Sequence, residues 1–361
     1  MTTTTTLPPS PAIKVDVGMH PACVLFAAGT VRCWGANWGG QLGNGSTTDS
    51  RTPVAVTGIN DAIGIVSGLN HSCVIRSDHT AACWGYNGDG ELGNGSRTNS
   101  ATPVAVQGLT DVVELAGGGG HTCARISTGE VLCWGYNWYG SVGDGTTTDR
   151  LVPTPNGITD AVSIAAGQHH ACAVRTDRTV SCWGYNYMGE AGSTSGQVVP
   201  TPQTVSGVTD ATTVDSTYSH TCATTTADTY VQCWGYNASG ELGSGQTTPF
   251  QSPTPVSVGV GASAVSAGSG YTCARLPDRS VSCWGGNGSG ELGQGTFSPL
   301  VLTPGPVVGI ANVTDLSAGV NSTCAVLNSG GVRCWGDNGS GKLGDGTTTA
   351  RSTPTPVLGL G

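Results

Sequence analysis

The sequence has few of the residues that build helices or nucleic-acid-binding surfaces. Only three phenylalanines and three methionines occur in 361 residues, against 58 glycines and 19 prolines. Because glycine and proline favour tight turns, long amphipathic helices are excluded and an all-β protein of short strands is expected. The chain has 14 basic and 23 acidic side chains and no basic run, which argues against nucleic acid or anionic lipid as a partner.

Long apolar runs are also missing. No segment approaches the roughly 20 consecutive apolar residues of a membrane-spanning helix, so no membrane insertion is expected. The first eleven residues are rich in threonine and proline and contain no apolar signal core. We expect residues 1–11 to form a disordered linker, or the stub of a stalk or of a removed targeting segment, outside the folded domain.

Motifs that support catalysis are the third absence. The sequence has no single-copy Ser/His/Asp arrangement, no phosphate-binding loop and no paired carboxylates in a distinctive motif. These groups carry out most hydrolytic and phosphoryl-transfer chemistry. We therefore expect a monomeric binding protein that is not an enzyme and needs no cofactor.

What the sequence does contain is a sevenfold repeat. Cys-Trp-Gly occurs seven times at intervals of 49 to 51 residues. In a glycine-rich sequence this period is the length of one four-stranded blade, so a seven-bladed β-propeller of antiparallel blades is expected over 12–361. The predicted blades are 12–58, 59–108, 109–157, 158–207, 208–259, 260–309 and 310–361.

The third repeat shows the unit. Strand-like runs cover 111–116, 121–126, 130–135 and 152–155, and Ser127-Thr128-Gly129 predicts a three-residue hairpin turn between the second and third strands. The loop 136–151 is rich in Asn, Gly, Asp and Thr, which predicts a compact, self-hydrogen-bonded turn system. Loops of this kind usually hold binding specificity.

Fourteen cysteines fall two per repeat, and none is left over. A hairpin centred on Thr128 places Cys123 opposite Cys133, and facing residues of an antiparallel pair lie about 4.5 to 5.5 Å apart, within disulfide range. One hairpin disulfide per blade is expected, and with it an oxidising compartment. The predicted bridges are Cys23–Cys33, Cys73–Cys83, Cys123–Cys133, Cys172–Cys182, Cys222–Cys233, Cys273–Cys283 and Cys324–Cys334.

Metal binding is the alternative use of these cysteines. Four repeats have a histidine two residues before the first cysteine, which could complete a His/Cys/Cys set. Structural zinc normally uses cysteine pairs two to four residues apart and four ligands, and three repeats lack the histidine. No metal site is therefore expected. The histidines are His71, His121, His170 and His220.

The full repeat is Gly-x-x-His-[Thr/Ser]-Cys, a turn, Val-x-Cys-Trp-Gly-x-Asn-x-x-Gly-Glu-Leu-Gly-x-Gly, and Thr-Pro-Val, carried best by 83–95 and 334–346. It resembles the regulator of chromosome condensation repeat over essentially the whole chain. The resemblance implies a seven-bladed propeller whose relatives include an exchange factor for Ran, plant ultraviolet receptors and bacterial β-lactamase inhibitors. The paired cysteines and acidic balance depart from the nuclear members and place the chain beside secreted bacterial ones.

Residues that recur in every repeat are expected to serve the fold. The tryptophans would fill the space between neighbouring blades, with the bridges on the opposite face of the strand. The asparagine three residues after each tryptophan would bond the backbone of its own loop. The fourth repeat has 190–196, Glu-Ala-Gly-Ser-Thr-Ser-Gly, in place of the usual Leu-Gly-x-Gly pattern, so its loop should differ in shape.

Departures from the repeat are the better guide to function. Directly after the loop asparagine, four repeats have small residues and three have bulky ones. Aromatic residues on loop tips cost solubility unless they contact something, and they are the usual anchors of interfaces. Packing beneath their own loop is the alternative, weighted equally. These candidate binding residues are Trp38, Trp138, Tyr139, Tyr187 and Met188.

A second asymmetry concerns repeats two to five, where a tyrosine follows Cys-Trp-Gly and the histidine is also present. In the hairpin register set by the cysteines, His71 faces Gly85. Tyr86 would then be a diagonal neighbour of His71, and a hydrogen-bonded pair is expected. Because the four repeats define an arc of the ring, their tyrosines join the candidate binding residues. They are Tyr86, Tyr136, Tyr185 and Tyr236.

These features predict an extracellular or periplasmic binding module, secreted or at the cell surface, that recognises a protein partner through one propeller face. A lectin-like propeller is the first alternative, since Trp and Tyr beside Asn and Asp suit sugar rings and hydroxyls. A purely structural cell-surface module is the second.

Overall fold

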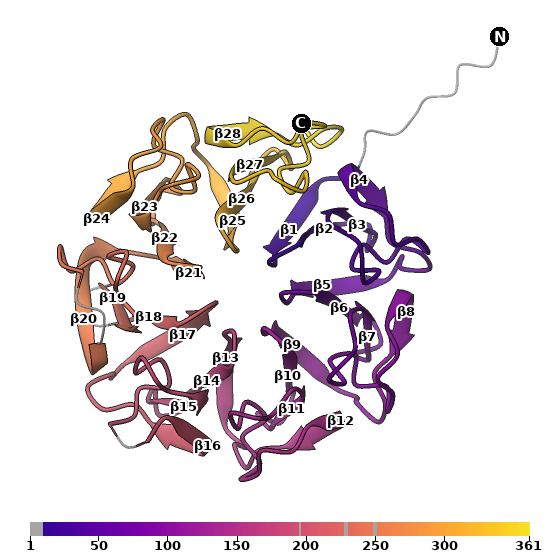
Figure 1. Ribbon diagram of the computed structural model, residues 1–361, viewed down its shortest axis with the longest axis vertical. Coiled ribbons are helices and arrows are strands. Elements are labelled where there is room, and N and C mark those ends of the chain that lie inside the picture. The colour runs from indigo at the N-terminus through magenta and orange to yellow at the C-terminus, as the bar shows by residue number, and fades with distance from the viewer. Residues whose placement is uncertain (1–9, 195, 227–229, 248–250) are drawn as a thin grey trace.

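A computed structural model describes residues 10–194, 196–226, 230–247 and 251–361. In this part of the chain 28 strands form seven four-stranded sheets around a central axis (Figure 1). The predicted all-β, seven-bladed propeller is confirmed. Of the predicted linker, only Ser10 and Pro11 are among the described residues. None of the described segments is a helix long and apolar enough to cross a membrane.

Each blade is a meander of four consecutive antiparallel strands, with the first at the central channel and the fourth at the rim (Figure 1). Blades 1 and 2 consist of β1 (Ala12–Val17), β2 (Pro21–Phe26), β3 (Val31–Gly35), β4 (Ser50–Ala55), β5 (Ala62–Ser67), β6 (His71–Arg76), β7 (Ala81–Gly85) and β8 (Ser100–Ala105). Blades 3 and 4 consist of β9 (Val112–Gly117), β10 (His121–Ile126), β11 (Val131–Gly135), β12 (Arg150–Pro155), β13 (Ala161–Ala166), β14 (His170–Arg175), β15 (Val180–Tyr185) and β16 (Val198–Thr204). Blades 5 to 7 consist of β17 (Ala211–Ser216), β18 (His220–Thr225), β19 (Tyr230–Gly235), β20 (Gln251–Gly261), β21 (Ala264–Gly268), β22 (Tyr271–Arg275), β23 (Val281–Gly286), β24 (Leu300–Pro306), β25 (Val313–Ala318), β26 (Ser322–Leu327), β27 (Val332–Gly336) and β28 (Arg351–Pro356).

The strands of blade 3 begin and end within two residues of their predicted positions. Gly129 closes the hairpin turn with φ of 90°, a conformation that glycine adopts without strain. The predicted blade boundaries lie in the segments that connect the blades, and their exact residues stay a prediction.

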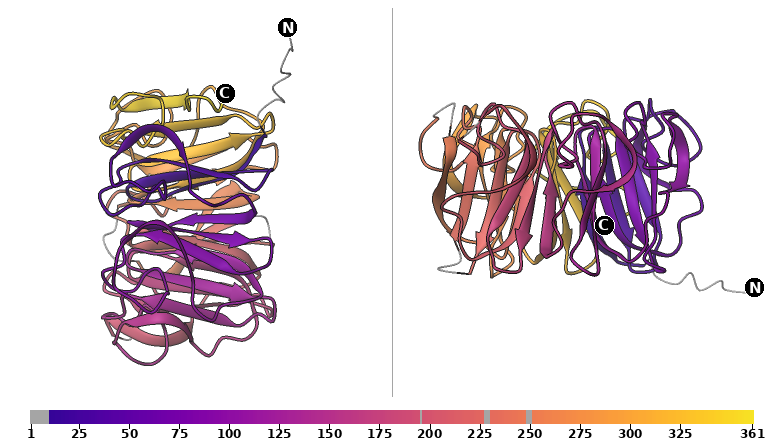
Figure 2. Two further views of the ribbon diagram at one scale, coloured as in Figure 1. Left: turned by 90° about the vertical axis from the view of Figure 1, so that its right-hand side faces the viewer. Right: turned by 90° about the horizontal axis from the view of Figure 1, so that it is seen from below.

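The meander divides the connections between two faces of the disc, which Figure 2 shows from the side. The first and third strands of a blade run in the same direction. The turn after the first strand and the long loop after the third therefore lie on one face, here called the loop face. The hairpin turns after the second strand and the connections between blades lie on the other, the turn face.

The repeated tryptophans join each blade to the one before it. All seven are fully buried. Trp84 Nε1 of blade 2 donates to the Gln41 carbonyl of blade 1 at 2.8 Å. Trp34 Nε1 of blade 1 donates to the Lys342 carbonyl of blade 7 at 2.7 Å, so the same contact closes the ring. The indole needs a glycine beneath it, because a Cβ at Gly43 would lie 2.8 Å from Trp84 Nε1.

All fourteen cysteines form the seven predicted disulfides, each between the second and third strands of one blade. Cys123 lies directly opposite Cys133, which is the register predicted from the turn. Because every cysteine sulfur is in a disulfide, no thiolate remains for zinc. The described residues also contain no group of three or more His, Cys, Asp or Glu side chains that could hold a metal ion.

The predicted pairing of His71 with Tyr86 is wrong. His71 does face Gly85, but its Nε2 lies 2.8 Å from Thr122 Oγ1 of the next blade. The Thr122 hydroxyl in turn donates to the Glu91 carbonyl at 2.9 Å. The Tyr86 N–H continues the pairing by donating to the Asn70 carbonyl at 2.9 Å, but the Tyr86 ring lies 5.6 Å from the ring of Trp38 in blade 1.

This contact recurs at two further boundaries between blades. His170 Nε2 lies 2.9 Å from Thr221 Oγ1, and His220 Nε2 lies 2.9 Å from Thr272 Oγ1. The boundary between blades 3 and 4 lacks it, since the threonine position is occupied by Ala171 in blade 4. His121 is fully buried, and neither ring nitrogen has a hydrogen-bond partner among the described residues. Burial is the largest of the causes that lower the pKa of His121 to about 3.

Ala171→Thr should therefore stabilise the protein. The new hydroxyl would lie where Thr122 lies one blade earlier and would give His121 a partner, so we expect a gain of about 1 kcal/mol in the free energy of unfolding, measured by chemical denaturation. The matched control is Thr122→Ala, which removes the partner of His71 and should cost about 1 to 3 kcal/mol. A loss of stability in Ala171→Thr would contradict this account of the boundary.

Candidate binding face

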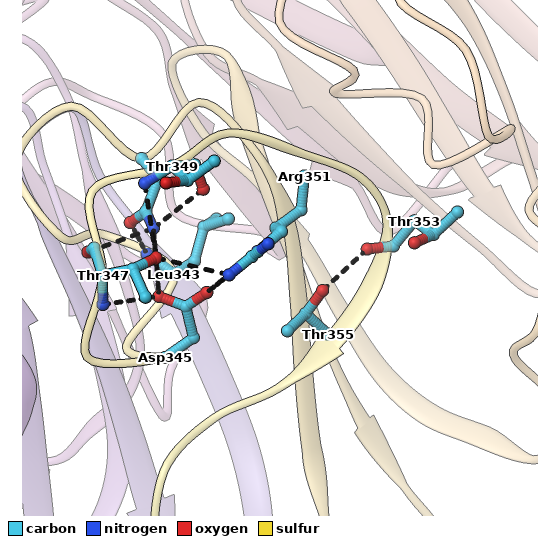
Figure 3. A network of polar contacts seen from close by, with 8 residues as sticks. Leu343, Asp345, Thr347, Thr349, Arg351, Thr353 and Thr355 are labelled. Atoms are coloured by element: carbon cyan, nitrogen blue, oxygen red, sulfur yellow. Dashed lines mark hydrogen bonds and ion pairs between the residues drawn. The ribbon is translucent and has the colours of Figure 1, made fainter.

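The long loops of the loop face are held by their own side chains. In blade 7, Asn338 Oδ1 accepts the Leu343 N–H at 3.0 Å and Asn338 Nδ2 donates to the Thr347 carbonyl at 3.2 Å. Asp345 accepts both the N–H and the hydroxyl of Thr347 and pairs with Arg351 at 2.8 Å (Figure 3). The asparagine role predicted from the repeat is confirmed. Hydrogen bonds and an ion pair within the loop hold its tip in place.

The loop of blade 4 differs, as its sequence predicts. In blade 3 Asn137 Nδ2 donates to the carbonyls of Thr146 and Thr148, nine and eleven residues later. In blade 4 Asn186 Nδ2 instead donates to the carbonyls of Ser193 and Gly196, seven and ten residues later. Ala191 takes the fully buried position that leucine holds in most other blades.

Behind the loop tips lies a buried carboxyl position. In blade 5, Glu241 Oε2 accepts the Ser239 N–H at 2.7 Å, and burial raises the pKa of Glu241 to about 7. In blade 1 the same contact is made by a neutral amide, from Gln41 Oε1 to the Gly39 N–H at 2.7 Å. The side chain at this position therefore supports the loop without needing a charge.

Glu241→Gln should change how stability depends on pH. The folded-state pKa of Glu241 lies above the unfolded value, so the folded state holds the extra proton at pH 5 and loses it as the pH rises through about 7. This acid therefore lowers stability as the pH rises, whereas glutamine does not titrate. We expect the free energy of unfolding of the variant, relative to wild type, to increase by about 1 to 3 kcal/mol between pH 5 and pH 8. A difference that is constant with pH would show that Glu241 is ionised throughout.

Four candidate tyrosines of blades 3 and 4 form one cluster on the loop face. The ring centroid of Tyr139 lies 4.7 Å from that of Tyr185 and 6.0 Å from that of Tyr136. Tyr187 is stacked on Tyr185 at 6.3 Å. His169, in the turn between β13 and β14, lies 5.3 Å from Tyr139 and 5.2 Å from Tyr136. The cluster therefore crosses the boundary between the two blades.

His169 was missed by the sequence analysis. Its position precedes the repeated histidine and is filled by Asn, Gly or Ser in five blades. Only blades 1 and 4 have a histidine there, His20 and His169. A comparison of this position across the seven repeats would have identified both.

Trp38 forms a second contact between blades. Its ring lies 5.6 Å from Tyr86 of blade 2 and 6.1 Å from His20, and 51% of Trp38 remains exposed. The bulky loop-tip residues of blades 1, 3 and 4 are therefore not buried beneath their own loops.

The remaining candidates lie apart from these ring contacts. Trp138 is 70% exposed and has no ring partner within the described chain. Met188 and Tyr236 are half-buried, and no ring contact of Tyr236 is found in the part of the chain that the structure covers.

We use the name aromatic arc for eight ring-bearing side chains on the loop face of blades 1 to 4. They are Trp38, Tyr86, Tyr136, Trp138, Tyr139, His169, Tyr185 and Tyr187.

A charged bridge joins the loops of blades 2 and 3 within this arc. Arg97 Nη2 lies 2.9 Å from Asp149 Oδ2, and Arg97 Nη1 lies 3.7 Å from Asp89 Oδ1. Burial and the neighbouring Asp149 raise the pKa of Asp89. Burial, Tyr139 and the two carboxylates raise the pKa of Tyr136. Two carboxylates therefore share one guanidinium in this part of the arc.

Two models of one repeat family match the chain. The regulator of chromosome condensation (RCC1) repeat model matches residues 28–75, 83–125 and 128–174, and a second RCC1 model matches 62–91, 161–190 and 313–342. Together they cover more than half of the sequence. The chain belongs to the RCC1 repeat family.

Solved structures share the fold of this RCC1 propeller. Prp20p from Saccharomyces cerevisiae aligns with a TM-score of 0.79 and 19% identity, over 97% of this chain and 87% of that one. Human WBSCR16 aligns with a TM-score of 0.76 and 20% identity, over 87% and 86%. The ectodomain of the Physcomitrella patens receptor kinase CR4 aligns with a TM-score of 0.55 and 21% identity, over 90% and 72%. Identities this low establish the fold alone.

The central channel of the RCC1 propeller is separate from the aromatic arc. It contains a cavity of about 340 Å³ lined by the first strands of the blades. Its carboxylates hold neighbouring blades together: Asp16 accepts the Ser67 N–H at 2.8 Å, and Asp315 accepts the Val15 N–H at 2.8 Å. These acids have a structural role in the ring.

Proposed function

We propose that this RCC1 propeller is a binding module, without catalytic activity, that recognises a protein partner through its aromatic arc. The observation that carries the proposal is the continuity of the arc across four consecutive blades. The ring contacts join blade 1 to blade 2 and blade 3 to blade 4, and Arg97 bridges the loops between them. Trp38, Trp138 and Tyr187 still expose 51%, 70% and 46% of their surface.

The fold has no need of bulky side chains at these tips. The position of Trp38 is Gly88 in blade 2, Ala238 in blade 5 and Gly288 in blade 6. In each of these loops the asparagine side chain accepts the backbone N–H of the leucine five residues later, which is Leu92, Leu242 or Leu292. Exposed aromatic side chains that the fold does not require are typical anchors of protein interfaces.

The breadth of the arc favours a protein over a single sugar. A standard protein interface covers about 800 Å² on each partner, an area on the scale of several neighbouring loops. Prp20p, which has the same fold, binds Gsp1p and histones. Seven disulfides support a site of action in an oxidising compartment outside the cytosol.

Affinity capture with matched baits tests the proposal. The baits are the wild type, Trp138→Gly in the arc and Phe297→Ser, an exposed loop-face aromatic of blade 6 that is 54% exposed and lies outside the arc. One protein from the fluid that surrounds the producing cells should be retained by the wild type and by Phe297→Ser. The Trp138→Gly bait should retain at least about tenfold less of it.

Two results would contradict the proposal. Equal retention by Trp138→Gly would show that the arc is not the binding face. Reproducible binding of one glycan class on an array, lost in Trp138→Gly, would identify a lectin in place of a protein-binding module.

A further inference from the structure

The middle of the aromatic arc contains a carboxylate that is only partly neutralised. Asp149 and Asp89 share one guanidinium, and Arg97 lies closer to Asp149, at 2.9 Å, than to Asp89, at 3.7 Å. The Asp149 side chain is 13% exposed, whereas that of Asp89 is 36% exposed. Asp89 is therefore the member of this pair with charge available to a partner.

Asp89 lies beside the rings of the arc. A Cβ built at Gly120 would lie 3.0 Å from Tyr136 Cβ and 3.9 Å from Asp89 Oδ2, so the carboxylate and the ring flank the same glycine. Asp89 also contributes to the raised pKa of both Tyr86 and Tyr136, which are in blades 2 and 3. The carboxylate thus lies between the two halves of the arc.

Positive charge is scarce in this region. The loops 36–49, 86–99, 136–149 and 186–197 of blades 1 to 4 contain one basic residue, Arg97. Burial lowers the pKa of His169 to about 4, and burial together with Lys342 lowers the pKa of His20. Both histidines are therefore neutral at pH 7, and the arc combines ring faces with negative charge that Arg97 neutralises only in part.

We propose that the arc recognises a basic segment of its protein partner, in which a lysine or arginine side chain pairs with Asp89 and lies against Tyr86 or Tyr136. A cation over an aromatic ring is attracted by the electrons of the ring face, and a nearby carboxylate adds a direct ion pair. This inference rests on the proposed function and specifies the chemistry of the partner. Arg97 competes with the incoming cation for Asp89.

A phage-displayed library of random dodecapeptides provides the probe. Selection on the wild-type protein should enrich peptides that contain lysine or arginine. For a selected synthetic peptide, fluorescence anisotropy should show affinity about fivefold to tenfold lower in Asp89→Asn and about threefold higher in Arg97→Gln. Higher salt should weaken wild-type binding, because part of the contact is exposed to solvent.

The control is Asp278→Asn, a fully exposed acid on the turn face, where asparagine can keep the turn contact with Ser280. This variant should bind like the wild type. The opposite effects of the Asp89 and Arg97 substitutions separate charge recognition from damage to the loop, since damage would weaken binding in both.

The outcomes distinguish this inference from the proposed function. Selected peptides without basic residues that bind the wild type but not Trp138→Gly would leave the binding face in place and overturn its preference for cations. Peptides that bind Trp138→Gly and Tyr187→Gly as well as they bind the wild type would overturn both. A selection that enriches no basic peptide would also contradict the inference.

Discussion

Reduction of the seven disulfides is expected to unfold the protein. Each bridge spans ten or eleven residues of sequence. The chain-entropy model assigns a loop of this size at most about 2 to 3 kcal/mol, so the seven together contribute up to about 14 to 21 kcal/mol. A typical domain has a net stability of only about 5 to 15 kcal/mol.

The measurement uses full denaturation with dithiothreitol, alkylation of the thiols and removal of the denaturant, followed by circular dichroism. The alkylated chain should lack the strand signal and the thermal transition. A sample taken through the same steps without reductant or alkylation should regain both, and it should show no free thiol while denatured. Recovery of the native melting temperature by the alkylated chain would contradict a stabilising role for the bridges.

Trp34→Ala is expected to lower the free energy of unfolding by about 3 to 5 kcal/mol, the usual cost of removing a fully buried tryptophan. The side chain packs between blades 7 and 1, in one buried cluster with Val326, Val332 and Val357. Its hydrogen bond to the Lys342 carbonyl would be lost as well. Chemical denaturation monitored by circular dichroism measures the change.

Trp38→Ala is the matched control, four residues further along the chain in the loop that follows β3. Trp38 is 51% exposed, so we expect its loss to cost less than about 1 kcal/mol. Equal losses of unfolding free energy in the two variants would mean that Trp38 stabilises the ring as much as Trp34 does. That result would contradict the assignment of Trp38 to binding.

The features predicted correctly from the sequence are those with local causes. The distance between Cys123 and Cys133 along the chain sets the hairpin register, and the structure has that register. The period of the repeat sets the blade length, and the number of repeats sets the number of blades. Each loop asparagine bonds backbone within about a dozen residues of itself, so turn chemistry alone predicts it.

The features that the sequence analysis missed or mispredicted involve contacts between blades. His71 meets Thr122, 51 residues away, and only the packing of two blades brings them together. Likewise, the proximity of Asp89 to Tyr136, and of His169 to Tyr139, depends on how neighbouring loops meet on the loop face. A pattern within one repeat carries no information about such contacts, although comparison of equivalent positions in adjacent repeats would have suggested some of them.

The division between side chains that build the ring and side chains that bind a partner is tested most directly by the triple variant Trp38→Gly, Trp138→Gly, Tyr187→Gly. Its melting temperature and its affinity for the captured partner protein should be measured on the same preparation. The melting temperature should change by no more than about 3 °C, because glycine already occupies this position in three other blades. The affinity should fall by about 2 kcal/mol or more, roughly 30-fold. A large fall in melting temperature, or an unchanged affinity, would contradict the assignment of the aromatic arc to binding.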